Sequence, residues 1–272
     1  MELTLTAPDG YRLGATTFGA GERAVLILPA TGVPQSYYAK FAAYLAERGF
    51  SVLTFDYRGI GRSLHGPLRR VNARMRDWAL LDAGAAFRSL THKKIVVVGH
   101  SFGGQILGLL PEPERIHAAA LVGSPSGYWR HWSLAGRLWV WPVTHVLLPT
   151  LPRLLGYLPM GAAGFGEDLP AGVAMEWATW CRHPRYVVGA LGADASYARV
   201  RMPLRSYAIT DDAFAPLPAV RGLLALYPNA KTQLCALRPE TLKEKSIGHF
   251  GFFRERFRDS LWRETAEWLE RQ

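Results

Sequence analysis

A serine lies between two glycines at the sharpest turn that the sequence predicts. Residues 99–103 read Gly-His-Ser-Phe-Gly, after the β-branched run at 96–98 and before a segment with helical composition. A strand that turns directly into a helix exposes such a serine at the top of a sheet, near the positive end of the helix. Small residues two positions before and after it let the strand and the helix pass closely. We therefore predict that Ser101 is a nucleophile rather than an incidental serine in a glycine-rich turn.

A serine nucleophile needs a general base, and the base needs a carboxylate that orients it. When the serine occupies a strand–turn–helix elbow, the acid and then the histidine follow it along the chain. Of the eight histidines, only His249 follows the last predicted strand, in a loop before the final helix. We predict that His249 is the base, rather than a half-buried loop histidine.

The acid is expected after the penultimate strand, which ends near Thr210. Two candidates follow it, Asp211 and Asp212, before the turn closes at Pro216. We favour Asp212 over Asp211, and expect the other aspartate to cap the turn or to contact solvent.

The elements that must position these residues alternate along the chain. Segments 2–6 and 11–18 flank Pro-Asp-Gly and predict a hairpin. Further strands are expected at 24–30, 51–56, 93–99, 118–123, 203–210 and 231–237, and helices at 35–48, 69–90, 103–110 and from 253 to the end. Apolar strands alternating with helices predict an α/β fold, with a mostly parallel sheet of about eight strands and helices on both faces.

The strand pattern lapses between residues 124 and 199. We predict a core of residues 1–123 and 200–272 and an inserted helical lid at 124–199, because an insertion after a strand's carboxyl end lies over the crevice where open sheets bind ligands. An ordered turn is expected at 164–170. The insertion holds six of the nine tryptophans, of which Trp129, Trp132, Trp177 and Trp180 are candidates for an apolar acyl pocket. For most of them we favour the alternative, a small core within the lid.

Composition restricts the class of partner. The net charge is +10, but the arginine clusters at 69–76 and 254–258 are broken by acidic residues or lie on predicted amphipathic helices, which favours solvated faces over a nucleic-acid site. The two cysteines, Cys181 and Cys235, have no metal-ligand spacing and indicate buried thiols in a reducing compartment. No secretory pattern begins the chain, and the lipophilic stretch 138–152 is too short and too rich in proline to span a bilayer. We expect a cytoplasmic monomer or homodimer that binds a small-molecule substrate, without nucleic acid or stable membrane insertion.

Four segments together resemble the α/β-hydrolase superfamily over nearly all of the chain outside the insertion. They are GHSFGG, FDYRGIGRS, TDDAFAP and GHFGFF, which begin at residues 99, 55, 210 and 248. The second contains the family's D-x-R-G-x-G-x-S pattern at 56–63, and the family's D-x-x-x-P pattern around the acid favours Asp212. More narrowly, the chain resembles uncharacterised bacterial serine hydrolases described as serine-aminopeptidase-like. The resemblance implies the α/β-hydrolase fold with an inserted helical lid.

One loop departs from the family. Members usually carry His-Gly after the strand that ends here at Leu28, whereas this chain reads Pro-Ala-Thr-Gly at 29–32. The family's oxyanion hole takes one backbone N–H from this loop and one from the residue after the nucleophile. Because backbone donors need no particular side chain, we expect the N–H groups of Phe102 and of Thr31 (or Ala30) to serve.

These residues predict a serine hydrolase that needs no metal or cofactor. We expect it to cleave a carboxylic ester or thioester with an apolar acyl group through an acyl-enzyme. The alternatives are a peptidase or amidase, an acyltransferase, and a non-catalytic binding protein on the same fold. A dehalogenase is disfavoured, because that reaction needs a carboxylate where the elbow carries a serine.

Overall fold

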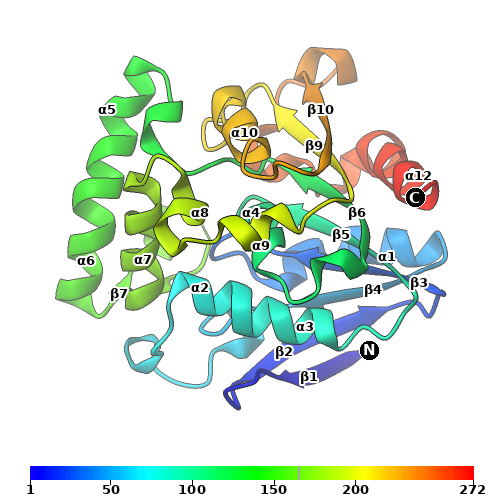
Figure 1. Cartoon of the computed structure of the whole chain (residues 1–272), viewed down its shortest axis with the longest axis horizontal. Helices are drawn as coiled ribbons and strands as arrows, with labels where there is room; N and C mark the ends of the chain where they lie inside the picture. The colour runs from blue at the N-terminus through cyan, green and yellow to red at the C-terminus, as the bar shows by residue number, and fades with distance from the viewer. Residues whose placement is uncertain (165) are drawn as a thin grey trace.

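An eight-stranded sheet organises the chain (Figure 1), as seen in a computed structural model that describes residues 1–164 and 166–272. The strand order is β1-β2-β4-β3-β5-β6-β9-β10, and β2 alone runs opposite to the other strands. The strands are β1 (Glu2–Thr6), β2 (Arg12–Phe18), β3 (Arg23–Leu28), β4 (Phe50–Phe55), β5 (Lys94–His100), β6 (Ile116–Val122), β9 (Pro203–Ile209) and β10 (Lys231–Leu237). The prediction of an α/β fold with about eight mostly parallel strands is confirmed.

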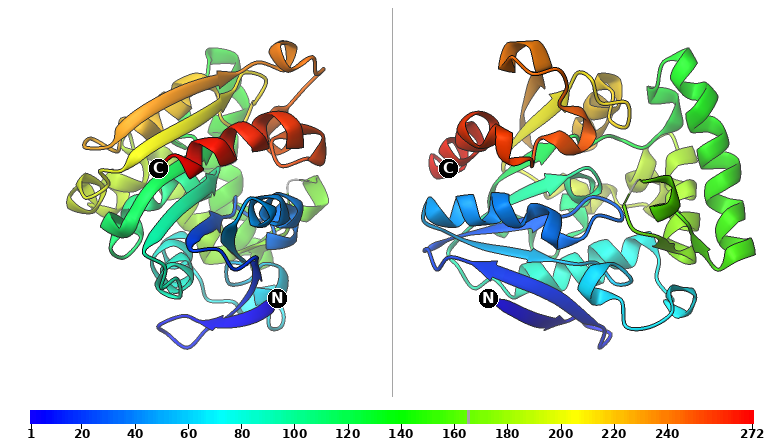
Figure 2. Two further views of the ribbon diagram at one scale, coloured as in Figure 1. Left: turned by 90° about the vertical axis from the view of Figure 1, so that its right-hand side faces the viewer. Right: turned by 180° about the vertical axis from the view of Figure 1, so that it is seen from behind.

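Both faces of this sheet are buried, which explains why its central strands are almost wholly apolar. Successive side chains of a strand point to opposite faces. In β3, Leu26 and Leu28 therefore join one core cluster, while Val25 and Ile27 join the other. Helix α3 (Gly84–Arg88) covers the first face, and α1 (Ala39–Glu47) and α12 (Arg263–Glu270) cover the second, as the rear view in Figure 2 shows.

The helices are more broken than their spacing predicts. The expected helix at 69–90 consists of a 3-10 turn (Leu68–Arg70), α2 (Met75–Asp77), a π-helical stretch (Trp78–Ala83) and α3. The last helix likewise begins with a 3-10 turn (Glu255–Phe257) and a π-helical stretch (Arg258–Trp262) before α12. The spacing of apolar residues shows which face of such a segment is buried. It does not show whether one turn contains an extra residue, as a π-helical turn does.

The helix after the serine is much shorter than expected. It comprises α4 (Phe102–Gln105), followed by a 3-10 turn at Leu107–Leu109. Two buried hydroxyls take the carbonyl groups that a longer helix would use: Tyr227 Oη donates to Gly104 O at 2.8 Å, and Tyr197 Oη donates to Gln105 O at 2.5 Å. These contacts to distant parts of the chain end the helix.

The segment between β6 and β9 is mainly helical and lies at one side of the sheet (Figure 1). It comprises α5 (Leu134–Pro142), a π-helical stretch (Val143–Leu147), α6 (Leu148–Leu155), β7 (Tyr157–Leu158), β8 (Leu169–Pro170), α7 (Ala171–Arg182), α8 (Tyr186–Leu191) and α9 (Asp194–Ala198). Of the turn expected at 164–170, Phe165 lies outside the described residues. Three α-helices follow β9 within the described residues: α10 (Leu217–Leu224), α11 (Gly248–Gly251) and α12. None of the helices in the described part of the chain has both the length and the apolar character needed to cross a membrane.

Candidate active site

Ser101 occupies a strained turn between β5 and α4. Its backbone has φ +50° and ψ −112°, outside the regions that most residues prefer. The flanking glycines are required by space: a Cβ on Gly103 would lie 2.0 Å from the carbonyl oxygen of Leu28, and one on Gly99 would lie 2.6 Å from the nitrogen of Gly104. The turn therefore holds the serine at the carboxyl end of the central strand, where it lines a cavity.

His249 and Asp212 form a buried pair beside this cavity. His249 lies in α11 and Asp212 follows β9, and their Nδ1 and Oδ2 atoms are 2.7 Å apart. The other oxygen, Oδ1, accepts from the amides of Phe214 and Ala215 at 2.8 and 3.0 Å. An ionised carboxylate can only accept, so it orients the neutral imidazole with its proton on Nδ1 and its Nε2 free to accept. Among the described residues, Ser101 Oγ has no hydrogen-bond partner.

The neighbouring Asp211 holds the histidine loop from outside. Its Oδ2 accepts from the amides of Ile247 and Gly248, at 2.9 and 3.1 Å. The residue is exposed, but its carboxylate binds a distant loop instead of capping its own turn. The two adjacent aspartates thus fix His249 in different ways: Asp212 contacts the ring, and Asp211 contacts the backbone that carries it.

Gly123 at the end of β6 was not singled out from the sequence, although it lies against the pair. It has φ +51°, and a Cβ there would lie 3.1 Å from Asp212 Oδ2 and 3.4 Å from His249 Nδ1. A side chain at this position would press on both partners. The only signal in the sequence is a glycine directly after a buried strand.

A chain of hydrogen bonds connects the loop after β3 to the histidine loop. The Ala30 N–H donates to Tyr38 Oη at 2.9 Å, and Tyr38 Oη lies 2.8 Å from His100 Nδ1. His100 Nε2 lies 3.0 Å from the carbonyl oxygen of His249, which can only accept. His100 therefore carries its proton on Nε2, and Tyr38 donates to Nδ1. Burial, and secondly the nearby His249, hold the pKa of His100 well below its usual value, so this imidazole is neutral.

The same hydrogen bonds restrict which backbone N–H groups could serve as the expected oxyanion donors. Because the Ala30 N–H is already bonded to Tyr38, it is not available to a substrate. Thr31 and Ser101 line the same cavity, and Phe102 is the first residue of α4, where backbone N–H groups have no partner within the helix. Of the two loop residues considered, the arrangement favours Thr31.

Asp56 anchors the loop that carries Thr31. Its carboxylate is buried and accepts from the Gln35 backbone N–H at 2.6 Å, from Gln35 Nε2 at 2.8 Å and from the Arg62 N–H at 3.0 Å. Burial raises the pKa of Asp56, and these hydrogen bonds act in the opposite direction. The first residue of the D-x-R-G-x-G-x-S pattern therefore ties the loop after β4 to the loop after β3.

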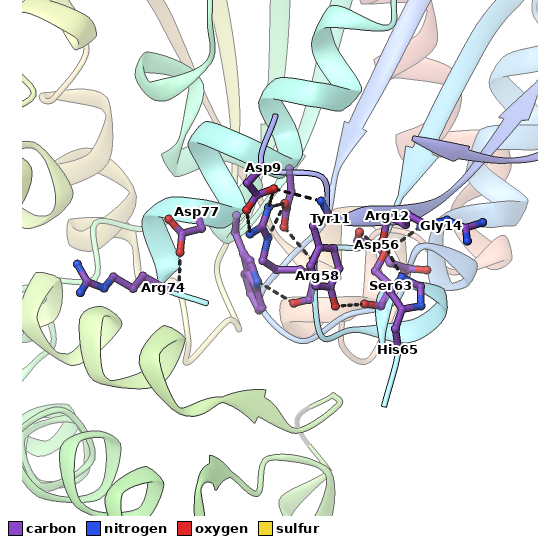
Figure 3. Close-up of polar contacts among 12 residues, drawn as sticks. Asp9, Tyr11, Arg12, Gly14, Asp56, Arg58, Ser63, His65, Arg74 and Asp77 are labelled. Carbon is purple, nitrogen blue, oxygen red and sulfur yellow. Dashed lines mark hydrogen bonds and ion pairs between the residues drawn. The ribbon is translucent and has the colours of Figure 1, made fainter. Parts of the chain in front are cut away.

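The other polar residues of that pattern hold the N-terminal hairpin (Figure 3). Arg58 has a side chain only 4% exposed; its Nε donates to Asp82 Oδ1 at 2.8 Å and its Nη1 pairs with Asp9 Oδ2 at 2.5 Å. The Tyr11 ring lies 4.8 Å from the guanidinium, and its hydroxyl donates to the Ser63 carbonyl at 2.6 Å. The pattern thus supports the site's scaffold and does not line the cavity.

Glu167 fastens the helical segment to the same two loops. Its backbone N–H donates to Gly32 O at 2.7 Å, and its Oε2 accepts from the Gly61 N–H at 2.7 Å. Gly32 directly follows Thr31, so this clasp fixes the residue next to the proposed oxyanion donor.

The cavity above Ser101 has a volume of about 560 Å³ and is predominantly apolar. Trp132, Trp139 and Trp177 line it, together with aliphatic residues of α5 and α6. Two of the predicted pocket residues lie elsewhere. Trp180 is fully buried and packs edge-to-face on Tyr186, and Trp129 packs edge-to-face on His145.

Cys181 also lines the cavity, but burial raises the pKa of its thiol far above the usual value, so it is not a thiolate nucleophile at neutral pH. Cys181 and Cys235 are both free. Among the described residues, no group of three or more His, Cys, Asp or Glu side chains is placed to hold a metal ion.

Three known proteins illustrate what the chain is similar to. A protein of Mycobacterium phage D29 named as a non-heme haloperoxidase is 30% identical over 133 residues, which are 47% of this chain and 45% of that protein. An esterase from Exiguobacterium antarcticum superposes with a TM-score of 0.69 at 17% identity, over 99% of this chain and 100% of its own. An esterase from Pyrococcus furiosus superposes with a TM-score of 0.63 at 16% identity, over 100% and 90%.

The chain spans about half the length of the phage protein that it matches, and the two esterases establish a shared fold only. A family model described as "Alpha/beta hydrolase family" matches residues 25–256, which include the serine elbow, the Asp–His pair and the segment between β6 and β9. This chain therefore belongs to the alpha/beta hydrolase family.

Proposed function

We propose that this protein is a serine hydrolase that cleaves carboxylic esters with apolar acyl groups. The observation that carries the proposal is the buried Asp212–His249 hydrogen bond at 2.7 Å, beside a cavity that Ser101 lines from a strained elbow. The esterase neighbours support the same reaction class. A thioester with the same acyl group fits the same chemistry.

In the first half of the reaction, His249 Nε2 takes the proton of Ser101 Oγ while this oxygen attacks the ester carbonyl. Asp212 holds the proton on Nδ1 and stabilises the imidazolium that forms. The backbone N–H groups of Phe102 and Thr31 donate to the oxygen that becomes negative in the tetrahedral intermediate. The carbon–oxygen bond to the alcohol then breaks, and the alcohol leaves with the proton from His249.

In the second half, His249 Nε2 takes a proton from water, which attacks the acyl carbonyl. The tetrahedral intermediate collapses, Ser101 Oγ leaves with the proton from His249, and the carboxylic acid departs. The neutral state of His100 assists both halves. Its ring centroid is only 5.1 Å from that of His249, and a second positive charge there would oppose formation of the imidazolium.

The segment at 124–199 serves in this proposal as a lid, and residues 1–123 and 200–272 as the catalytic core. Support comes from the cavity, whose walls include Ser101 and His249 from the core and Trp177, Leu148 and Leu151 from the segment. A wall of this composition fits an aliphatic or aromatic acyl chain.

A fluorophosphonate probe tests the nucleophile directly, and p-nitrophenyl esters of increasing acyl length test turnover. Native protein should label and hydrolyse, while Ser101→Ala and His249→Ala should lose both. Ser89→Ala and His117→Ala are matched controls, because both residues are exposed and neither lines the cavity. Folded native protein that neither labels nor hydrolyses any ester would refute the proposal.

A further inference from the structure

The helical segment 134–155 carries apolar side chains both toward the cavity and toward solvent. Val140, Leu148 and Leu151 line the cavity. Leu134 and Leu138 of α5 and Leu154 of α6 are 79%, 81% and 75% exposed, and Trp141 of α5 is 46% exposed. The spacing of four and three between 134, 138 and 141 places these three residues on one side of α5. We call these three residues, together with the exposed Leu154, the outer face.

This outer face lies at the margin of the molecule. In Figure 1 and in the rear view of Figure 2, α5 and α6 form the side of the fold away from α12, with no described element beyond them. Leucines exposed to this extent in a cluster indicate a contact with an apolar partner, since scattered exposure of single residues is the ordinary case.

The segment that carries the outer face contains charged side chains of one sign only. Residues 116–166 contain no aspartate or glutamate, but they contain Arg130, Arg137 and Arg153. Arg130 lies just before α5 and Arg153 in α6, and both are exposed. Apolar side chains flanked by arginine, with an interfacial tryptophan, match the surface of a bilayer that contains anionic lipids.

We propose that the outer face, with Arg130 and Arg153, binds peripherally to the surface of an anionic lipid bilayer. A second copy of the chain fits less well. In a two-fold symmetric dimer the same patch lies on both subunits, so the arginines of one copy would meet those of the other with no carboxylate from this segment between them. Anionic headgroups supply the missing negative charge. This binding needs no assumption about the reaction at Ser101.

Flotation with lipid vesicles tests the proposal. Native protein should float with vesicles of phosphatidylcholine and phosphatidylglycerol, should float less with phosphatidylcholine alone, and should be released from the mixed vesicles at high salt. The double variant Leu138→Ser/Leu154→Ser should lower the partition coefficient about tenfold or more, because two leucines that the bilayer would bury are lost from the contact. Arg130→Glu/Arg153→Glu should abolish the preference for anionic vesicles.

Matched controls come from other faces of the molecule. Leu80→Ser removes a leucine that is 42% exposed in the π-helical stretch after α2, and Arg263→Glu reverses an exposed charge on α12. Both should bind as the native chain does. Light scattering measures the oligomeric state in solution and so tests the alternative partner, a second copy of the chain. Native protein that ignores anionic vesicles, outer-face variants that bind unchanged, or a native dimer that these variants dissociate without any vesicle binding would each overturn the proposal.

Discussion

The two adjacent aspartates give the sharpest test of the site, because the same substitution should have different consequences at each. In Asp212→Asn, the side-chain oxygen is held toward the Phe214 and Ala215 amides, which would otherwise be left without an acceptor at about 1–3 kcal/mol each. The amide nitrogen then faces His249 Nδ1, which must accept. The imidazole proton moves to Nε2, where it blocks removal of the Ser101 proton.

We therefore expect Asp212→Asn to lower kcat by about 10⁴-fold, as when this tautomer is imposed on other triads. That corresponds to about 5.5 kcal/mol of activation free energy. Asp211→Asn keeps an oxygen for the Ile247 and Gly248 amides and weakens only their charge-assisted character. It should lower kcat less than tenfold and the free energy of unfolding by about 1 kcal/mol.

The measurements are kcat with a p-nitrophenyl ester and urea unfolding for the native chain and both variants. Circular dichroism confirms that each variant is folded. Equal losses of kcat in the two variants, or an Asp212→Asn protein that is folded and retains more than about a tenth of native kcat, would refute the tautomer argument.

Three further predictions concern the supporting residues. Tyr38→Phe leaves the Ala30 N–H and the His100 ring nitrogen without their partner, so steady-state kinetics should show a loss in kcat larger than the change in KM. The pKa of the buried His100 is well below its value in the unfolded chain, near 6.5, so the unfolded chain is protonated at His100 first as the pH falls. Below pH 6.5 the free energy of unfolding should therefore drop by up to about 1.4 kcal/mol per pH unit from this group. Urea titrations at a series of pH values should show a shallower pH dependence in His100→Asn. Asp82→Asn leaves the buried Arg58 short of a charge partner and should cost about 3–5 kcal/mol in urea unfolding, whereas Asp9→Asn, at a side chain that is 41% exposed, should cost clearly less.

The sequence predicts the parts of this molecule that depend on local spacing and chain order. Ser101 stands out because its elbow needs glycines at two fixed positions, and His249 because one histidine alone follows the last strand. The two hairpin strands follow from alternation around Pro-Asp-Gly, and the central strands follow from short apolar runs between turns. The signals for the elbow and the strands are local, and the signal for His249 is its order along the chain.

The remaining features depend on contacts between distant segments. Asp211 and Asp212 are adjacent, and the contacts that distinguish them are made to the loop around His249, 37 residues further along the chain. Trp177 and Trp180 lie on the same helix, both sides of which are apolar, so composition could not tell which one lines the cavity. The hydrogen bond from the Ala30 N–H to Tyr38 could not be predicted from the sequence either, because it depends on how the loop after β3 folds back toward Tyr38.

The two hydrogen bonds of Glu167 couple the entry of substrate to the order of the loop next to the catalytic groups. Any movement that carries residue 167 away from the core must break its bonds to Gly32 and Gly61. Gly32 adjoins Thr31, so under the proposed mechanism an open protein would have a less ordered oxyanion hole than a closed one. Admission of a substrate and attack on its carbonyl would then be separated in time, and the proposed acyl-enzyme would react fastest when residues 124–199, the proposed lid, are fastened again.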